Sequence, residues 1–224
     1  MTEVEIGRSK RAINGYAFDD IAIVPTRRTR DPGDVSTSWS IDAFQFDMPV
    51  IAAPTDSAMS PATVIALGKL GGLGVLDLEG LWTRYEDPTQ QLAEIANAKD
   101  EDATAVLQRV YSQPIQAELI RARLEEIRAA GVRVAGALSP QRTAEFSEIV
   151  LKSGVDMFVI RGNTVSAEHV SQGAEALNLK EFIYQLDVPV IVGGAATYTA
   201  ALHLMRTGAA GVLVGFGGGA ASAT

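Results

Sequence analysis

Short apolar runs alternate with longer amphipathic segments along most of the chain. A run such as 48–53 is apolar at nearly every position, which is typical of a parallel strand covered on both faces. Amphipathic helices are predicted between such runs, and two of them begin with a serine followed by a proline. Residues 104–109 fit neither pattern clearly. The predicted strands are 48–53, 73–78, 132–138, 157–160, 188–192 and 211–214, with helices over 60–70, 87–98, 114–130, 139–153, 174–186 and 197–207.

The regular alternation of strand and helix predicts an α/β fold with a parallel sheet, because parallel strands need crossover connections. An open doubly wound sheet and a (β/α)8 barrel both fit. A dinucleotide-binding open sheet carries its glycine loop after the first strand. Here residues 54–57 follow the first strand without a glycine, and the glycine-rich segment 215–220 follows the sixth strand. This favours a TIM barrel, in which phosphate sites lie late in the strand order.

We therefore predict two parts of unequal size. Residues 47–224 form a partial TIM-barrel domain with its first six strands present, and residues 1–46 form an N-terminal extension. Within the extension, residues 18–25 read as a short strand that Pro25 closes. Because strands seven and eight would follow Thr224, we expect a truncated product or a partial sequence.

Composition excludes several classes of protein. The net charge of -8 and the pI of about 4.8 argue against a nucleic-acid binder, which usually shows a basic patch. No cysteine is present, so disulfides, thiolate metal sites and a cysteine nucleophile are excluded within these residues. No stretch approaches about 18 consecutive apolar residues, and the first residues lack an apolar signal segment. We expect a cytoplasmic protein that does not bind a membrane.

The glycines of 215–220 are the most informative candidate for chemistry. Successive residues without a Cβ let the backbone curl around an anion, although glycines near a chain end also form flexible tails. The place of this segment directly after a predicted buried strand favours the anion site. Asp56 follows the first strand and either orients a substrate or caps the next helix, and spacing alone slightly favours the cap.

Polar residues after the second strand have two interpretations each. Asp77 and Glu79 are placed for acid–base work, but solvated charges at the sheet edge are favoured. Trp82, Arg84 and Tyr85 offer a stacking surface for a base, but a packed loop anchor is favoured.

Several motifs resemble the IMP dehydrogenase and GMP reductase family. The run MPVIAAPTDSAMS (48–60) with GKLGGLGVL (68–76) resembles the first strand, helix and second strand of that family, and FDDIAIVP (18–25) resembles its N-terminal strand. VGGAAT (192–197) is similar to its strand-five motif, and VGFGGGAASAT (214–224) is similar to its catalytic loop. The resemblance implies a (β/α)8 barrel. The short connection after Leu78 resembles the branch of the family that lacks CBS modules.

The resemblance also implies redox chemistry at C2 of a purine mononucleotide, IMP or GMP. In this family a cysteine attacks the base, hydride passes to or from NAD or NADP, and the phosphate lies on the glycine loop. A homotetramer and a potassium ion bound by loop carbonyls occur in family members. Carried over to this sequence, the catalytic residues are Ser222 and Thr224, the cofactor residues Arg161 and Asn163, the potassium ligands Gly217, Gly219 and Ser222, and the substrate residues Ala53, Thr55, Asp56, Gly194, Gly217, Gly218, Gly219 and Ala220.

The chain departs from the family pattern at several of these positions. Ser222 stands where the family has its cysteine, Ala220 replaces a phosphate-contacting serine, and Gly194 replaces a purine-contacting asparagine. A serine hydroxyl is a weak nucleophile without a neighbouring base. A nucleotide-binding or regulatory barrel without catalysis is therefore the alternative. A third reading is an unrelated phosphate-binding barrel.

Overall fold

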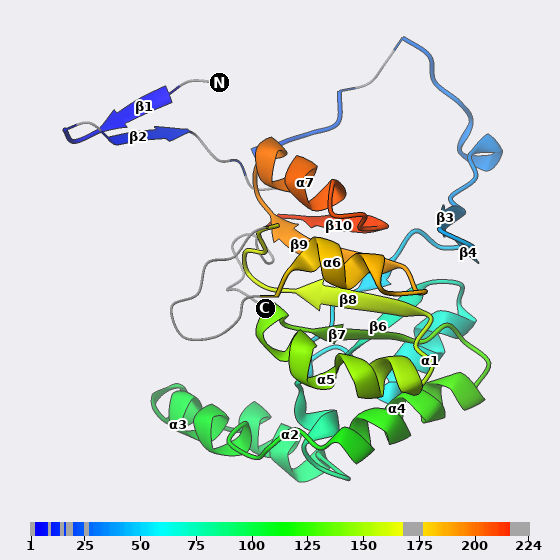
Figure 1. Cartoon of the computed structure of the whole chain (residues 1–224), viewed down its shortest axis with the longest axis vertical. Coiled ribbons are helices and arrows are strands. Elements are labelled where there is room, and N and C mark those ends of the chain that lie inside the picture. The colour runs from blue at the N-terminus through cyan, green and yellow to red at the C-terminus, as the bar shows by residue number, and fades with distance from the viewer. Residues whose placement is uncertain are drawn as a thin grey trace.

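The computed structural model describes residues 3–8, 10–13, 16, 20–24, 27–167 and 177–215. Its main sheet has six strands, all parallel, in the order β10-β9-β8-β7-β6-β5 (Figure 1). Each strand therefore pairs with the next one along the chain, and the sheet curls into a half-barrel rather than reversing its order as a doubly wound sheet does. The strands are β5 (Ile51–Ala52), β6 (Leu73–Asp77), β7 (Ala135–Leu138), β8 (Met157–Arg161), β9 (Val190–Ala195) and β10 (Gly211–Val214).

Helices follow the strands as predicted, with one addition. The connection from β6 to β7 holds three α-helices after the short 3-10 helix η3 (Leu81–Thr83), and the unassigned residues 104–109 lie in the middle α-helix. The prediction over 174–186 is confirmed from residue 179, while residues 174–176 lie outside the described part. The helices are α1 (Pro61–Lys69), α2 (Thr89–Ala96), α3 (Asp100–Val110), α4 (Ala117–Ala129), α5 (Pro140–Lys152), α6 (Leu179–Tyr184) and α7 (Tyr198–Met205).

Capping residues fix the start of α1 and the end of α4. Ser60 caps α1, since its hydroxyl accepts the Thr63 N–H at 3.2 Å and the Thr63 hydroxyl accepts the Ser60 N–H at 2.6 Å. Pro61 takes the first helical position, where no N–H is needed. Gly131 follows α4 with a φ of +75°, a conformation that costs glycine little.

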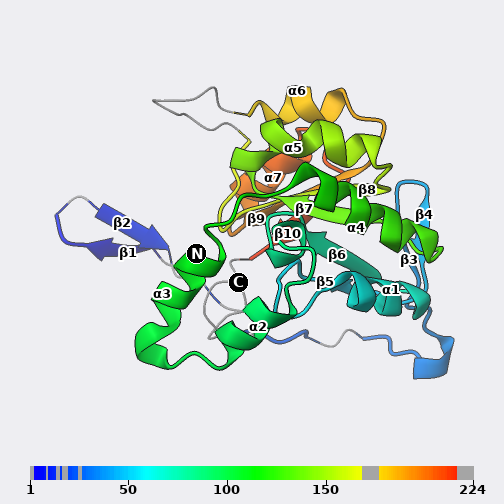
Figure 2. The ribbon, with the colours of Figure 1, turned by 90° about the horizontal axis from the view of Figure 1, so that it is seen from below.

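The two faces of the sheet bury different partners. One face packs against the helices, and Leu76, Leu138 and Phe158 lie in that core. The opposite face carries a second core, which these residues form with Ile41 and Phe46: Leu73, Val75, Ala135, Ala137, Met157, Val159 and Ile191. Ile41 and Phe46 belong to the antiparallel hairpin of β3 (Trp39–Ile41) and β4 (Phe44–Phe46), which lies beside the sheet in Figure 2.

The N-terminal extension differs from its prediction. Of the strand expected over 18–25, the structure describes residues 20–24, and these form no strand. Ile23 is 98% exposed, so its apolar run gains no burial there. The extension instead contains the hairpin of β1 (Glu3–Ile6) and β2 (Lys10–Ile13), the short 3-10 helix η2 (Pro32–Asp34) and the β3–β4 hairpin described above. Among the described residues, no helix combines the length and the apolar character that crossing a membrane requires.

Candidate functional site

Asp56 lies in the loop after β5, at the carboxyl edge of the sheet. Its Oδ2 accepts the Leu81 N–H at 2.8 Å and the Tyr111 hydroxyl at 2.6 Å. The helix that follows Asp56 is capped by Ser60, so the expectation that Asp56 caps this helix is wrong. The carboxylate instead joins three segments that are distant in the sequence.

The other carboxylate oxygen of Asp56 is buried, and no group in the described part of the chain donates a hydrogen bond to it. Gly80 lies against this oxygen, and a Cβ at that position would stand 2.4 Å from Oδ1. Burial raises the pKa of Asp56, while the hydrogen bonds from Tyr111 and Leu81 and the charge of Arg84 oppose the rise. Asp56 as a whole residue remains partly exposed at the strand ends.

Asp77 is the last residue of β6 and lies on the sheet face that carries Val75. Its Oδ1 accepts the Glu79 N–H at 2.9 Å. Burial is the main cause that raises the pKa of Asp77 to about 7, and the charges of Asp56 and Glu79 raise this pKa as well. The hydrogen bond from the Glu79 N–H and the charge of Arg161 lower it. The expectation of a solvated surface charge is therefore wrong for Asp77. A carboxyl group with a pKa near neutrality is suited to give or take a proton.

Glu79 is also partly buried and has a structural contact. Its Oε1 accepts the backbone N–H of Ser139, the residue that precedes α5. The carboxylate thus supplies an acceptor at a helix N-terminus, where negative charge is favourable. The expectation of a solvated charge is wrong for Glu79 as well, and the contact ties the loop after β6 to the loop after β7.

The segment from Trp82 to Tyr85 is a packed anchor, as the favoured interpretation held. The Arg84 guanidinium donates to the carbonyl of Glu79 at 2.9 Å and to that of Tyr111 at 3.0 Å. Arg123 lies over the Trp82 ring, 5.5 Å from its centroid. These side chains are used for packing within the protein, and Trp82 is not an open stacking surface.

Arg161 and Asn163, the predicted cofactor residues, follow the end of β8. Arg161 is partly buried, faces Asp77 and lies near the Pro54 carbonyl, to which its Nη1 donates at 3.4 Å. Asn163 is exposed. Among the predicted substrate residues, Ala53 is exposed and Thr55 is partly exposed, beside Asp56. The fold thus brings residues from three strand ends to one edge of the sheet.

Gly194 lies inside β9, which extends to Ala195, so the predicted end of this strand at residue 192 is wrong. The backbone after β10 approaches it closely, and a Cβ at position 194 would stand 2.4 Å from the Gly215 carbonyl oxygen. Its N–H donates to the Gly162 carbonyl at 2.9 Å. Close backbone packing therefore requires glycine here and leaves no room for a longer side chain.

The remaining predicted residues lie outside the described part of the structure. They are the glycine-loop positions expected to hold phosphate and potassium and to act in catalysis: Gly217, Gly218, Gly219, Ala220, Ser222 and Thr224. Their roles stay predictions. Within residues 27–167 and 177–215 and the shorter described ranges, no cluster of His, Asp or Glu is arranged to hold a metal ion.

Tyr111 is a site residue that the sequence analysis missed. It ends α3, 55 residues from Asp56, and its hydroxyl is nevertheless the shortest contact of the Asp56 carboxylate. Burial raises the pKa of Tyr111 far above the usual value for a phenol, and the hydrogen bond to Asp56 adds to the rise. No local motif marks a contact between loops this far apart in sequence.

Comparison of the chain with known protein families identifies one that it matches over most of its length. Residues 15–224 match the family described as the IMP dehydrogenase / GMP reductase domain. The chain is 49% identical to an uncharacterised oxidoreductase of Mycobacterium leprae and 48% identical to one of Mycobacterium tuberculosis, each over 219 residues. These alignments cover 96% of this chain and 58% of each relative. The chain thus spans less than two thirds of the length of these relatives.

A solved structure shows the same fold. The crystal structure of an IMP dehydrogenase/GMP reductase-like protein from Corynebacterium glutamicum superposes with a TM-score of 0.87 at 47% sequence identity. The match covers 96% of this chain and 58% of that protein. An inosine-5'-monophosphate dehydrogenase from Methanocaldococcus jannaschii is 34% identical over a shorter stretch of 65 residues, 29% of this chain and 13% of that protein.

Proposed function

Because the chain belongs to the IMP dehydrogenase / GMP reductase family of oxidoreductases, we propose that it acts in NAD- or NADP-dependent redox chemistry at C2 of a purine mononucleotide, IMP, XMP or GMP. The observation that carries the proposal is the placement of Asp56. This carboxylate is held by two donors at the carboxyl edge of a half-barrel. Active sites of barrel enzymes lie at this edge.

Asp56 suits the sugar of a nucleotide. A carboxylate only accepts hydrogen bonds, and ribose hydroxyls are donors that match it. Ala53 and Thr55 belong to the same loop and are at least partly exposed. The phosphate then lies on the backbone of Gly217–Gly219 and Ala220, because amide N–H groups free of side chains bind anions well.

The predicted cofactor residues, Arg161 and Asn163, differ in chemistry from the carboxylate of Asp56. A nicotinamide group, when bound, accepts or delivers the hydride at the purine. The Arg161 guanidinium has only donors, so it fits the phosphate oxygens of such a cofactor better than ribose hydroxyl donors. Asn163 is exposed two residues further and offers both donor and acceptor. A potassium ion would take the carbonyl oxygens of Gly217, Gly219 and Ser222.

The second candidate function is nucleotide binding without catalysis. The observation that favours it is the absence of cysteine from the whole sequence, with Ser222 at the position of the nucleophile in the family motif. An alcohol is far less ionised than a thiol at neutral pH and needs a neighbouring base to attack a purine ring. Purine nucleotides would then be ligands or regulators of the protein rather than substrates.

Hydride transfer separates the two functions. The purified chain is mixed with IMP and NAD, and separately with GMP and NADPH, while the absorbance of the reduced cofactor is followed. Turnover by the unmodified chain supports the oxidoreductase. Turnover only in Ser222→Cys supports a binding protein that has lost its nucleophile, provided that Ser36→Cys, a cysteine placed on an exposed loop residue, stays inactive.

A complete lack of turnover is resolved by binding. Titration calorimetry with IMP and GMP tests the nucleotide site without requiring chemistry. Binding without turnover in any variant supports the second function. Absence of both binding and turnover contradicts the proposal in either form.

A further inference from the structure

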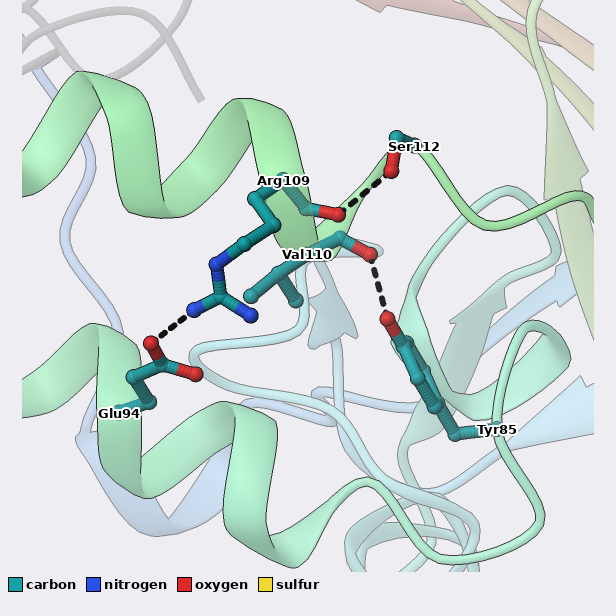
Figure 3. Close-up of polar contacts among 5 residues, drawn as sticks. All are labelled: Tyr85, Glu94, Arg109, Val110 and Ser112. Atoms are coloured by element: carbon teal, nitrogen blue, oxygen red, sulfur yellow. Dashed lines mark hydrogen bonds and ion pairs between the residues drawn. The ribbon is translucent and has the colours of Figure 1, made fainter.

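Helices α2 and α3 form a hairpin that projects from the body of the protein (Figure 1). The two helices are joined by the ion pair between Glu94 of α2 and Arg109, the next-to-last residue of α3 (Figure 3). The base of the hairpin, where α3 ends, reaches the carboxyl edge of the sheet. The end of α3 therefore connects the hairpin to the candidate site, through the contact of Tyr111 with Asp56.

Arg84 fastens the base of the hairpin to the loop after β6. Its guanidinium donates to the carbonyls of Tyr111 and Gln113 on the hairpin side and to that of Glu79 on the loop side. The same cation lies 5.7 Å from the centroid of the Tyr111 ring. One side chain thus fixes both the backbone and the ring of Tyr111.

Tyr85 makes a second, independent attachment. Its hydroxyl donates to the carbonyl of Val110 at 2.8 Å, one residue before Tyr111 (Figure 3). Both tyrosines therefore anchor the end of α3 through one hydroxyl each. They differ in that the Tyr111 hydroxyl ends on a side-chain carboxylate, whereas the Tyr85 hydroxyl ends on a backbone carbonyl.

We infer that Tyr111 is a positioning residue for Asp56, and that through it the seating of the α2–α3 hairpin controls how well the carboxylate receives a nucleotide. The nucleotide part of this inference rests on the proposed function. The positioning part stands on the contact itself. An O–H···O distance of 2.6 Å is that of a strong, charge-assisted hydrogen bond.

The direction of the effect follows from the groups around Asp56. The Tyr111 hydroxyl, the Leu81 N–H and the Arg84 charge all lower the pKa of Asp56 against the larger effect of burial. The charge of Asp56 acts on Asp77, on which Glu79 and Arg161 also act. Removal of the Tyr111 hydroxyl takes away a donor that favours the ionised form, so the pKa of Asp56 rises further.

The test compares Tyr111→Phe with its matched control Tyr85→Phe. Each variant loses one hydroxyl that ties the end of α3 to a loop at the carboxyl edge of the sheet, but only the first loses a contact to Asp56. Carboxyl 13C NMR titration of the full chain follows Asp56, whose signal is assigned by its loss in Asp56→Asn. We expect a higher titration midpoint in Tyr111→Phe and a wild-type midpoint in Tyr85→Phe. Equal midpoints in wild type and Tyr111→Phe overturn the inference.

Calorimetric titration with IMP measures the consequence for binding. We expect about tenfold weaker binding by Tyr111→Phe, the size of one lost hydrogen bond to a charged group, and wild-type affinity for Tyr85→Phe. Equal loss in both variants would mean a purely structural role and overturns the inference. If the wild type binds no IMP, the proposed function fails, while the NMR titration still decides whether Tyr111 positions Asp56.

Discussion

The carboxyl edge of the sheet is built in two different ways. At β5 and β6, side chains gather: Asp56, Asp77 and Glu79 are partly buried and are held by backbone N–H groups and by Tyr111. Where β9 meets the end of β10, Gly193 and Gly194 carry no side chains and let two backbones approach each other. One region presents ionisable groups, whereas the other presents peptide groups.

This difference predicts different sensitivities. Ionisable groups respond to pH, so the β5–β6 region should change with proton concentration. Peptide groups do not titrate, but a region packed without side chains has no room for a new one. We therefore expect a change of pH to affect the β5–β6 region and an added side chain to destabilise the β9–β10 region. The change in the free energy of unfolding measures each effect.

The largest expected effect is the dependence of the free energy of unfolding on pH, which Asp77 causes. Its pKa is about 7 in the folded protein against 3.8 in the unfolded chain, so folding binds a proton and stability is lost as pH rises from about 4 to about 7. About three pKa units correspond to roughly 4 kcal/mol. Asp77→Asn removes this loss and is expected to exceed the wild type in stability by that amount near pH 8, as urea unfolding measures.

Near pH 4 the Asp77→Asn variant and the wild type should unfold alike, because the carboxyl group is then protonated when folded. The exposed Asp187→Asn controls for the removal of one carboxylate. An unchanged pH dependence in Asp77→Asn would show that Asp77 is solvated, and the contrast between the two regions would fail.

The next effect belongs to the glycine region. Gly194→Ala places a Cβ 2.4 Å from the Gly215 carbonyl oxygen, and the strands must move apart to admit it. We expect a loss of about 1–3 kcal/mol in the free energy of unfolding, with no dependence on pH. The control is Gly33→Ala, since a Cβ there meets nothing within 4 Å. Equal stability of the two variants would refute close backbone packing at β9.

The smallest effect is expected outside both regions. Glu94→Gln removes the ion pair with Arg109, whose side chains are 44% and 60% exposed (Figure 3). Exposed pairs contribute little, so thermal unfolding should report a change below about 0.5 kcal/mol. A loss above about 1 kcal/mol would show that this pair, rather than Arg84 and the two tyrosines, seats the hairpin.

Periodicity and capping predicted most of the sheet and its covering helices. The start of α1 at Pro61 and the stop of α4 before Gly131 follow from local chemistry that a sequence shows directly. The run over 18–25 misled because an apolar pattern predicts a strand without saying whether a partner strand exists. Local sequence patterns therefore predict the positions of helices and strands well, but they predict less well which strands pair with each other.

The site was harder to predict because its contacts join distant segments. Glu79 bonds to Ser139, and Asp56 to Tyr111, across 60 and 55 residues respectively. Spacing along the chain suggested solvated charges for Asp77 and Glu79, whereas burial by neighbouring loops changes their environment. Gly194 shows the same limit, since only the approach of β10 explains why a side chain is absent there.

We propose that Asp56 and the strand ends around it receive a purine nucleotide. The most direct test is calorimetric titration of the chain and of Asp56→Asn with IMP, with inosine as the ligand that lacks phosphate. We expect tighter binding of IMP than of inosine by the wild type, and about tenfold weaker binding of IMP by Asp56→Asn. No binding of IMP, or equal affinity in both proteins, would contradict this proposal.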